Sequence, residues 1–168
     1  MTIRLAEKLE LPHIMKLFSQ CTAHMIAQGI DQWDEHYPNV EVVEQSITSG
    51  SMYAYFKDDL ICGAITLHIS QPTEYETIQW QSGQDAECLV VYRLGVDPEW
   101  QGQGIATKLM GFAEWYAGNH SLSSIRLDCY SKNERALSFY QHLHYEIRGT
   151  VIFPHSDVPF YCLEKRIR

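Results

Sequence analysis

Two glycines, Gly102 and Gly104, stand between an apolar stretch typical of a buried strand and a stretch with helical spacing. Glycine permits positive φ and lets a ligand approach the backbone closely. The first amides of the following helix lack an intrahelical acceptor, and the helix dipole adds positive potential there. This pattern predicts an anion site suited to a pyrophosphate. The residues that would form it are Gln101, Gly102, Gln103, Gly104, Ile105, Ala106 and Thr107.

The spacing of this turn differs from the commoner nucleotide-binding loops. Gly102-x-Gly104-x-x-Thr107 lacks the third glycine of a dinucleotide fingerprint, and no Gly-Lys-Ser/Thr triplet follows as in a P-loop. A nucleotide-binding oxidoreductase is therefore disfavoured. Taken alone, the turn could equally be a tight connection between a strand and a helix, and that structural alternative stays open.

The wider sequence resembles the GNAT N-acetyltransferase superfamily. Its motif A, Q/R-x-x-G-x-G/A, is matched by Gln101, Gly104 and Ala106, and about thirty residues later the segment Ser131–Tyr145 resembles motif B. His144 stands where the family usually has glycine, and we expect this departure to affect only local geometry. The residues that match motif B are Asn133, Ala136, Phe139, Tyr140, His144 and Tyr145.

The resemblance implies a site for acetyl-CoA as co-substrate. In the family, backbone groups of the fourth strand pair with the pantetheine arm, which here points to Leu94, Gly95 and Val96. Asn133 would contact the cofactor, although helix capping is an equally good explanation for it. Tyr140 would lie at the cofactor and protonate the departing thiolate; its alternative role is that of an aromatic residue on the apolar face of a helix.

The general base is not evident from the sequence. The attacking amine must be neutral, and at pH 7 about one α-amine in ten is neutral against about one lysine in two thousand. Family members often carry a glutamate on the fourth strand, but the position eleven residues before Gln101 is Val90. Glu87 has the opposite strand parity unless a bulge intervenes, and Tyr92 has the better parity. An ordered water is a further alternative.

The loop from Gly29 to Tyr37 is expected to set acceptor specificity, because the first two helices and their connection do so in the resembled family. Trp33 and Tyr37 could stack on the substrate, and Asp34 and Glu35 could attract its positive charge. Packing of the aromatic residues on the protein's own core, with a solvated acidic rim, is an equal alternative.

Composition narrows the class of protein further. The 168 residues, 45% of them apolar, predict one domain over residues 1–168. The net charge of −8 disfavours nucleic acid and anionic membrane as partners and favours an amine. The five cysteines are isolated and the histidines are unpaired, so we expect no structural zinc, no other metal, no disulfide framework and a cytoplasmic location.

Hydrophobic periodicity predicts the elements that position these residues. Strands are expected at 2–6, 52–57, 60–70, 87–97, 124–130, 144–148 and 159–164, and helices at 11–25, 39–50 and 104–117. A further helix is expected to begin at a capping box formed by Ser131 and Glu134, and the segment 75–80 to extend the flanking strands. This order predicts an α/β protein, a three-layer α/β/α sandwich with a mixed, mostly antiparallel sheet of the acyl-CoA N-acyltransferase type.

Together these features predict an acetyl-CoA-dependent N-acetyltransferase. It would acetylate a primary amine, of a small molecule or a peptide, by direct attack, with Tyr140 as general acid. The alternative is a non-catalytic acyl-CoA-binding sensor or interaction module. Edge strands near the C-terminus are compatible with a homodimer.

Overall fold

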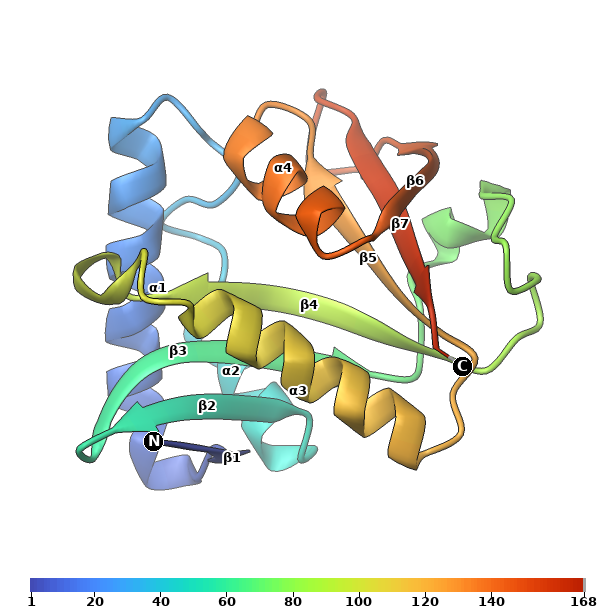
Figure 1. Cartoon of the computed structure of the whole chain (residues 1–168). Coiled ribbons are helices and arrows are strands. Elements are labelled where there is room, and N and C mark those ends of the chain that lie inside the picture. Colours follow the sequence, from blue (N-terminus) through green and yellow to red (C-terminus); the bar gives the residue numbers. More distant parts are fainter. Residues whose placement is uncertain (168) are drawn as a thin grey trace. The chain divides into compact units, whose positions relative to one another are not determined.

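The computed structural model describes residues 1–167 and divides into two compact units (Figure 1). Unit 1 comprises Met1–Leu67 and Tyr92–Phe112, and unit 2 comprises His68–Val91 and the chain from Ala113 onward. The strand β4 (Cys88–Val96) and the helix α3 (Ile105–Asn119) contribute residues to both units. The strands follow the order β1-β2-β3-β4-β5-β7-β6 in one seven-stranded sheet.

Unit 1 contains the strands β1 (Thr2–Leu5), β2 (Met52–Lys57) and β3 (Leu60–His68), each antiparallel to the next. Asp58 and Asp59, with φ of 49° and 64°, form the two-residue turn between β2 and β3. Two successive positive φ values match the right-handed twist of a hairpin. The predicted hairpin is therefore confirmed.

The helices of unit 1 cover both faces of these strands (Figure 1). A short 3-10 helix, η1 (Lys8–Glu10), leads into α1 (Leu11–Ala27), and α2 (Val40–Thr48) follows after a loop. Asn39 caps α2, because its side chain accepts a hydrogen bond from the amide of Val42.

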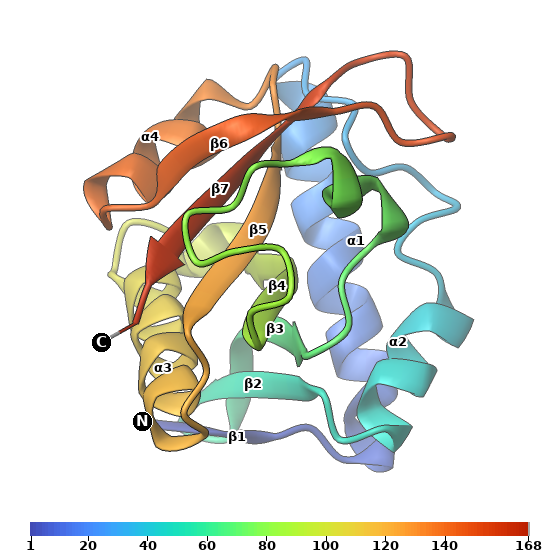
Figure 2. The same cartoon turned by 90° about the vertical axis from the view of Figure 1, so that its right-hand side faces the viewer.

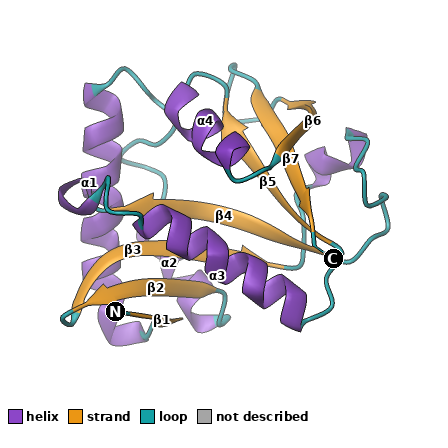
Figure 3. Ribbon diagram, in the orientation of Figure 1, coloured by secondary structure: helices purple, strands orange, loops and turns teal. Residues whose placement is uncertain are grey.

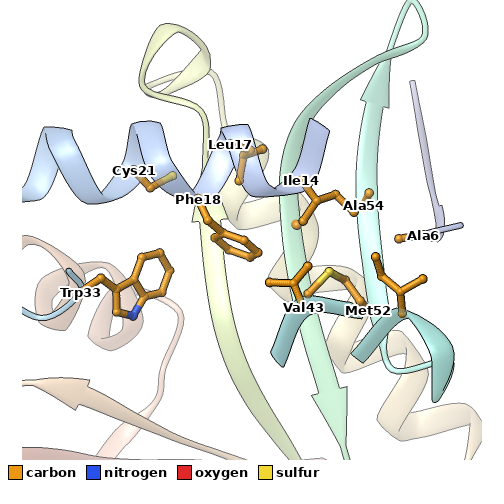
Figure 4. Packing of buried hydrophobic residues seen from close by; sticks show 11 residues of the cluster. Ala6, Ile14, Leu17, Phe18, Cys21, Trp33, Val43, Met52 and Ala54 are labelled. Carbon is orange, nitrogen blue, oxygen red and sulfur yellow. The ribbon is translucent and has the colours of Figure 1, made fainter. Parts of the chain in front are cut away.

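The core of unit 1 lies between α1, α2 and the sheet (Figure 4). Ile14 and Phe18 on α1, Val43 on α2 and Met52 on β2 are at most 1% exposed. On the other face, Gly63 leaves room for α3, since a Cβ there would lie 3.0 Å from side-chain atoms of Ile105 and Leu109. Burial of these apolar surfaces drives the layered arrangement.

Unit 2 is built on β5 (Ser124–Tyr130), β7 (Phe160–Arg166) and β6 (Glu146–Val151). β7 runs antiparallel to both β5 and β6, whereas β4 and β5 are parallel. The sheet is therefore mixed and mostly antiparallel, as predicted. Helix α4 (Glu134–His142) follows β5.

The segment 75–80, predicted to extend the flanking strands, forms no strand in the structure, and that prediction is wrong. A 3-10 helix, η2 (Thr73–Thr77), begins it, and the chain then crosses the β5–β7–β6 face (Figure 2). Tyr75 and Trp80 are buried with their rings 5.1 Å apart, and Ile78 fills the space above Gly149. Side-chain packing rather than strand pairing holds this long connection.

At the N-terminus of α4, the capping box predicted at Ser131 and Glu134 is wrong, and the helix-capping alternative given for Asn133 is confirmed. Asn133 rather than Ser131 is the N-cap, because its Oδ1 accepts a 3.1 Å hydrogen bond from the amide of Ala136. The spacing of Ser131 and Glu134 therefore matches a capping box by chance, since Asn133, directly before the helix, accepts from the free amide of Ala136.

The C-terminus of α4 explains the glycine expected in motif B. His144 has a φ of 67°, and its amide donates to the carbonyl of Gln141 while the amide of Tyr145 donates to the carbonyl of Tyr140. This pair of bonds is the Schellman motif, whose left-handed residue is usually glycine. The motif brings the rings of Tyr140 and Tyr145 to 6.1 Å.

The order of the α-helices and the seven strands agrees with the sequence prediction, whereas the 3-10 helices η1, η2 and η3 were not predicted (Figure 3). The main difference in bounds is β6, which begins two residues later than expected and extends to Val151. None of the helices within residues 1–167 combines the length and the apolar character needed to cross a membrane.

Candidate active site

The turn between β4 and α3 is the first part of the candidate site, and it lies within unit 1. A short 3-10 helix, η3 (Pro98–Trp100), follows β4, and the Asp97 side chain caps it by accepting a 2.9 Å hydrogen bond from the amide of Glu99. Gly102 and Gly104 then adopt φ of 74° and 77°, and nothing lies within 4 Å of a Cβ built on either. Both positions therefore require glycine for the backbone conformation and leave the backbone open to a ligand.

The amides of this turn are free to bind an anion. The first intrahelical bond of α3 runs from the amide of Lys108 to the carbonyl of Gly104, at 3.0 Å. Among residues 1–167, no carbonyl or side chain accepts from the amides of residues 102 to 107. Consecutive unpaired amides at a helix start fit the pyrophosphate of a coenzyme A derivative. The predicted cofactor residues from Gly102 to Thr107 are thus brought together.

Gln101 and Val96 contact each other in a way that the sequence does not predict. The Gln101 side-chain amide donates to the Val96 carbonyl at 3.2 Å, and the Cys21 thiol donates to the same carbonyl at 3.3 Å. The Val96 carbonyl is therefore already engaged, and Gln101 fixes the end of β4. Pairing of the pantetheine arm with Leu94, Gly95 and Val96 stays a prediction.

Gly95 has a packing role of its own. A Cβ on Gly95 would lie 3.1 Å from the Phe18 ring and 3.4 Å from the Cys21 sulfur. The close approach of α1 to β4 therefore accounts for this glycine. Leu94, next to it, is half-buried.

Arg93 is a site feature that sequence reasoning missed. It has a φ of 43° within β4, a left-handed conformation uncommon for a residue other than glycine. Its guanidinium donates to the Tyr37 hydroxyl and to the Ser46 hydroxyl, both at 2.9 Å. The available signal was a single charged residue in an otherwise apolar stretch. Because the left-handed residue Arg93 interrupts the alternation of side chains along β4, counting residues across it does not predict which face of the sheet a side chain is on.

The loop from Gly29 to Tyr37 divides between core and surface. Trp33 is 7% exposed and packs edge-on against the Phe18 ring at 5.5 Å (Figure 4). Asp34 accepts from the amides of His36 and Tyr37 at 2.7 and 3.0 Å, so it stabilises its own turn. Packing and turn formation account for these two residues without a substrate.

Glu35 and Tyr37 are the predicted acceptor residues that reach the surface. Glu35 is exposed and lies 3.5 Å from the His36 ring, and Tyr37 is 39% exposed. The bond from Arg93 fixes the Tyr37 hydroxyl. An acidic and an aromatic side chain are thus available at this surface of unit 1 for a cationic amine.

In unit 2, β5 carries an unpaired edge. The parallel register with β4 comprises Cys88↔Ser124, Leu89↔Ile125 and Val90↔Arg126, whereas β5 continues to Tyr130. Within the described part of the chain, no strand pairs with residues 127 to 129 on this side. Free backbone groups along a strand edge suit an extended, amide-bearing ligand such as a pantetheine arm.

Tyr140 lies on α4 and is half-buried. Burial raises the pKa of the Tyr140 hydroxyl well above its usual range, and the neighbouring Cys129 and Asp128 act in the same direction. The phenol is therefore protonated at neutral pH, as a proton donor must be, and it is a weaker acid than an ordinary tyrosine. Its hydroxyl forms no hydrogen bond within residues 1–167.

The two residues weighed as general base do not stand out in the structure. Glu87 is exposed and precedes β4, and its carbonyl accepts from the amide of Ser123 at 2.8 Å. Tyr92 is half-buried within β4, with the Arg93 guanidinium 5.7 Å from its ring centroid. A catalytic role for either residue stays a prediction. Across the described residues, no three His, Cys, Asp or Glu side chains gather in a group that could hold a metal ion.

Comparison with known proteins gives a consistent picture. The model of the Acetyltransferase (GNAT) family matches residues 12–145. The uncharacterized N-acetyltransferase YesJ of Bacillus subtilis (strain 168) is 26% identical over 124 residues, which cover 73% of this chain and 68% of YesJ.

Solved structures share the fold over almost the entire chain. A GNAT-family acetyltransferase from Streptococcus agalactiae 2603 superposes with a TM-score of 0.86 at 24% identity, covering 99% of this chain and 95% of the other. The PaiA N-acetyltransferase of Thermoplasma acidophilum, solved in complex with coenzyme A, gives a TM-score of 0.75 at 18% identity, covering 98% of each chain.

These matches confirm the resemblance drawn from the two sequence motifs. They confirm the predicted fold class, the acetyl-CoA-dependent N-acetyltransferase activity and acetyl-CoA as co-substrate. The open turn at residues 102 to 107, in unit 1, fits the pyrophosphate of that co-substrate. We conclude that this chain belongs to the GNAT family of acetyltransferases.

Proposed function

We propose that this protein transfers the acetyl group of acetyl-CoA to the primary amine of a small molecule or peptide by direct attack, with Tyr140 as general acid. The observation that carries the proposal is the open turn with its unpaired amides at residues 102 to 107. Family membership supplies the reaction class, and the free amides supply a place for the pyrophosphate.

In this proposal, the backbone does most of the cofactor binding. Amides of Gly102 to Thr107 donate to the pyrophosphate, and the dipole of α3 adds favourable potential. Backbone groups of Leu94 to Val96 pair with the pantetheine arm. The Asn133 Oδ1 caps α4, and a contact of this side chain with the cofactor is a further part of the proposal.

The chemistry requires little of the side chains, because acetyl-CoA supplies an activated thioester. The amine nitrogen attacks the carbonyl carbon, so that a C–N bond forms and the C–S bond breaks. Tyr140 donates its hydroxyl proton to the departing sulfur and regains a proton from solvent. Arg93 has a left-handed φ within β4, and a backbone amide at this irregularity is proposed to stabilise the oxyanion.

The acceptor is proposed to be cationic before it loses its proton. The net charge of −8 attracts such a molecule, and Glu35 and Tyr37 present an acidic and an aromatic group to it. Trp33 and Asp34 are proposed to support this loop rather than to touch the amine, because packing and turn formation account for both.

A panel of amines tests the proposal. The purified protein is incubated with acetyl-CoA and with peptides bearing a free α-amine, polyamines or lysine analogues, and released CoA thiol is measured. Release that depends on one class of amine is expected. Tight acetyl-CoA binding by calorimetry without thiol release would instead identify a non-catalytic sensor. The predicted homodimer, for which the edge strand β6 offers unpaired groups, is tested by sedimentation.

A further inference from the structure

We propose that Asp128 is the general base of this reaction and that the Tyr75 hydroxyl is its positioning group. The inference rests on the proposed function, because it names the proton acceptor for the same amine. The sequence favoured Glu87 and Tyr92 for this role. Asp128 belongs to no motif and lies within the regular strand β5, so the sequence alone does not identify it.

The position of Asp128 is the first argument. It lies on β5 beyond Arg126, the last residue in the parallel register with β4, in the stretch 127 to 129, with which no strand pairs on this side within the described residues. The Tyr75 hydroxyl donates a 2.7 Å hydrogen bond to its Oδ2. Within residues 1–167 its Oδ1 accepts no hydrogen bond. One oxygen is thus fixed and the other is available to accept a proton.

The relation to the proposed acid is the second argument. Successive residues of a strand point to opposite faces, so Asp128 and Cys129 flank β5 from opposite sides. The Cys129 thiol lies on the side of α4, 4.0 Å from the carbonyl of its N-cap Asn133, and α4 carries Tyr140. Acid and base therefore belong to one unit and to the same end of β5. A thioester along this open edge would have a proton donor toward one face and a proton acceptor toward the other.

The surroundings of Asp128 tune its basicity. Burial raises the pKa of the Asp128 carboxyl to about 6, while the Tyr75 hydrogen bond and the positive charge of His155 act in the opposite direction, and Glu74 raises it further. Cys162 on β7 lies opposite Asp128 in the register. The carboxylate is thus ionised at neutral pH yet more basic than an ordinary aspartate, as a general base requires.

The proton balance is simple. After the nitrogen attacks, it carries a positive charge and becomes acidic. Asp128 takes one proton from it as the C–N bond is completed, while Tyr140 gives one proton to sulfur as the C–S bond breaks. Asp128 then releases its proton to solvent, and Tyr140 takes one from solvent. The net transfer is one proton from the amine nitrogen to the CoA sulfur.

The competing explanation is purely structural, in that Asp128 only anchors η2 through Tyr75. Titration distinguishes the two. If Asp128 is only a structural anchor, the pH dependence of kcat/KM is unchanged in variants that remain folded. If it is the base, kcat/KM falls below a pH of about 6, and the pH of this fall shifts when a neighbouring charge or hydrogen bond is removed.

The experiment measures kcat/KM from pH 5 to 9, with the best amine from the panel, for the wild type, Asp128→Asn, Tyr75→Phe and Glu74→Gln. Asp85→Asn, an exposed carboxylate in the same β3–β4 connection, is the matched control. Asp128→Asn is expected to lose at least tenfold in kcat/KM at neutral pH, with the fall near pH 6 abolished and acetyl-CoA affinity retained. Asp85→Asn should match the wild type.

The neighbouring variants supply a test that does not depend on Asp128→Asn folding well. Glu74→Gln removes a negative charge and should shift the acidic fall to lower pH, whereas Tyr75→Phe removes a hydrogen bond to the carboxylate and should shift it to higher pH. Unshifted profiles in both variants, or a wild-type profile in Asp128→Asn, would overturn the assignment while leaving the proposed function intact. A wild type that releases no thiol with any amine would overturn both.

Discussion

The hydroxyl of Tyr75 donates a 2.7 Å hydrogen bond to Oδ2 of Asp128, which joins the 3-10 helix η2 to the central part of the unit 2 sheet. Tyr75 is fully buried, and the Trp80 indole donates to its carbonyl at 3.1 Å. A segment without strand pairing is therefore held by side chains, and its anchor is a titratable group. This relationship has consequences for stability as well as for catalysis.

Replacing Asp128 by Asn is expected to stabilise the protein at neutral pH. The folded-state pKa of about 6 lies above the ordinary value of 3.8, so folding favours the protonated form. The stability that the Asp128 carboxyl contributes through this shift is fully present below its unfolded pKa, and it is lost as the pH rises through about 6. At pH 7.5, Asp128→Asn should raise the free energy of unfolding by on the order of 1 to 3 kcal/mol.

The measurement is urea unfolding at pH 7.5 and at pH 4. Near pH 4 the gain should largely disappear, because the wild-type carboxyl is then neutral in the folded state. The Asn carbonyl can still accept from Tyr75, which keeps the anchor of η2. A gain of equal size at both pH values would show that the carboxylate is not responsible.

Tyr140→Phe is expected to lower kcat at least tenfold and to leave the acetyl-CoA dissociation constant nearly unchanged, because only the proton donor is lost. Calorimetry and thiol release measure the two quantities. Tyr116→Phe is the matched control, since Tyr116 lies on α3 and stacks on His120 at 4.0 Å, a contact that needs no hydroxyl. Unaltered turnover of Tyr140→Phe would remove this tyrosine from the mechanism.

Gly104→Asp is expected to weaken acetyl-CoA binding at least tenfold by calorimetry, because it places a carboxylate beside the pyrophosphate site. Gly50→Asp is a closely matched control. Gly50 has a φ of 69° against 77° for Gly104, and neither has an atom within 4 Å of a built Cβ. Both variants carry the same left-handed strain, so only the position differs. Equal loss of affinity in the two would place the pyrophosphate elsewhere.

Arg126 and Glu164 form a buried pair whose disruption should destabilise unit 2. Arg126 is 0% exposed, and it donates to the Gln71 side chain at 2.8 Å and to the Gly83 carbonyl at 2.6 Å. Arg126→Met leaves the Glu164 carboxylate without its countercharge, which typically costs about 3 to 5 kcal/mol. Adding Glu164→Gln should recover part of this loss in urea unfolding. No recovery would mean that the packing of Arg126, rather than its charge, matters.

The same pair carries a pH dependence of opposite sign to that of Asp128. Burial opposes ionisation of Glu164, but hydrogen bonds from the Ser82 hydroxyl and the Gln81 amide hold the pKa of the Glu164 carboxyl below its usual value. Its contribution to stability is therefore present above the unfolded pKa and is lost as the pH falls through the folded pKa.

Features coded by neighbouring residues could be predicted from the sequence. The helix spacing around Phe18, the two-residue turn at Asp58 and Asp59, and the glycine pattern at Gly102 and Gly104 all depend on local chemistry. The structure has each of them where the sequence placed it, because period, turn geometry and positive φ are properties of short segments.

Features that depend on tertiary contacts were not accessible in this way. The left-handed φ of Arg93 depends on partners from the 30–38 loop and α2, which are distant in sequence. The length of the connection between β3 and β4 favoured additional strand, but the Glu164 carboxylate accepts from the amides of Gln81 and Ser82 in place of a neighbouring strand. The aromatic ring of Trp33 could stack on a substrate, but the ring packs against Phe18 and is buried. In each case a long-range partner decides the outcome.

The most direct test of the central claim is a crystal structure of the protein with acetyl-CoA bound. The account predicts that pyrophosphate oxygens lie about 2.7 to 3.2 Å from backbone nitrogens of residues 102 to 107, the range of ordinary N–H···O bonds. Density for the cofactor on any other part of the chain, with these amides still unpaired, would contradict it.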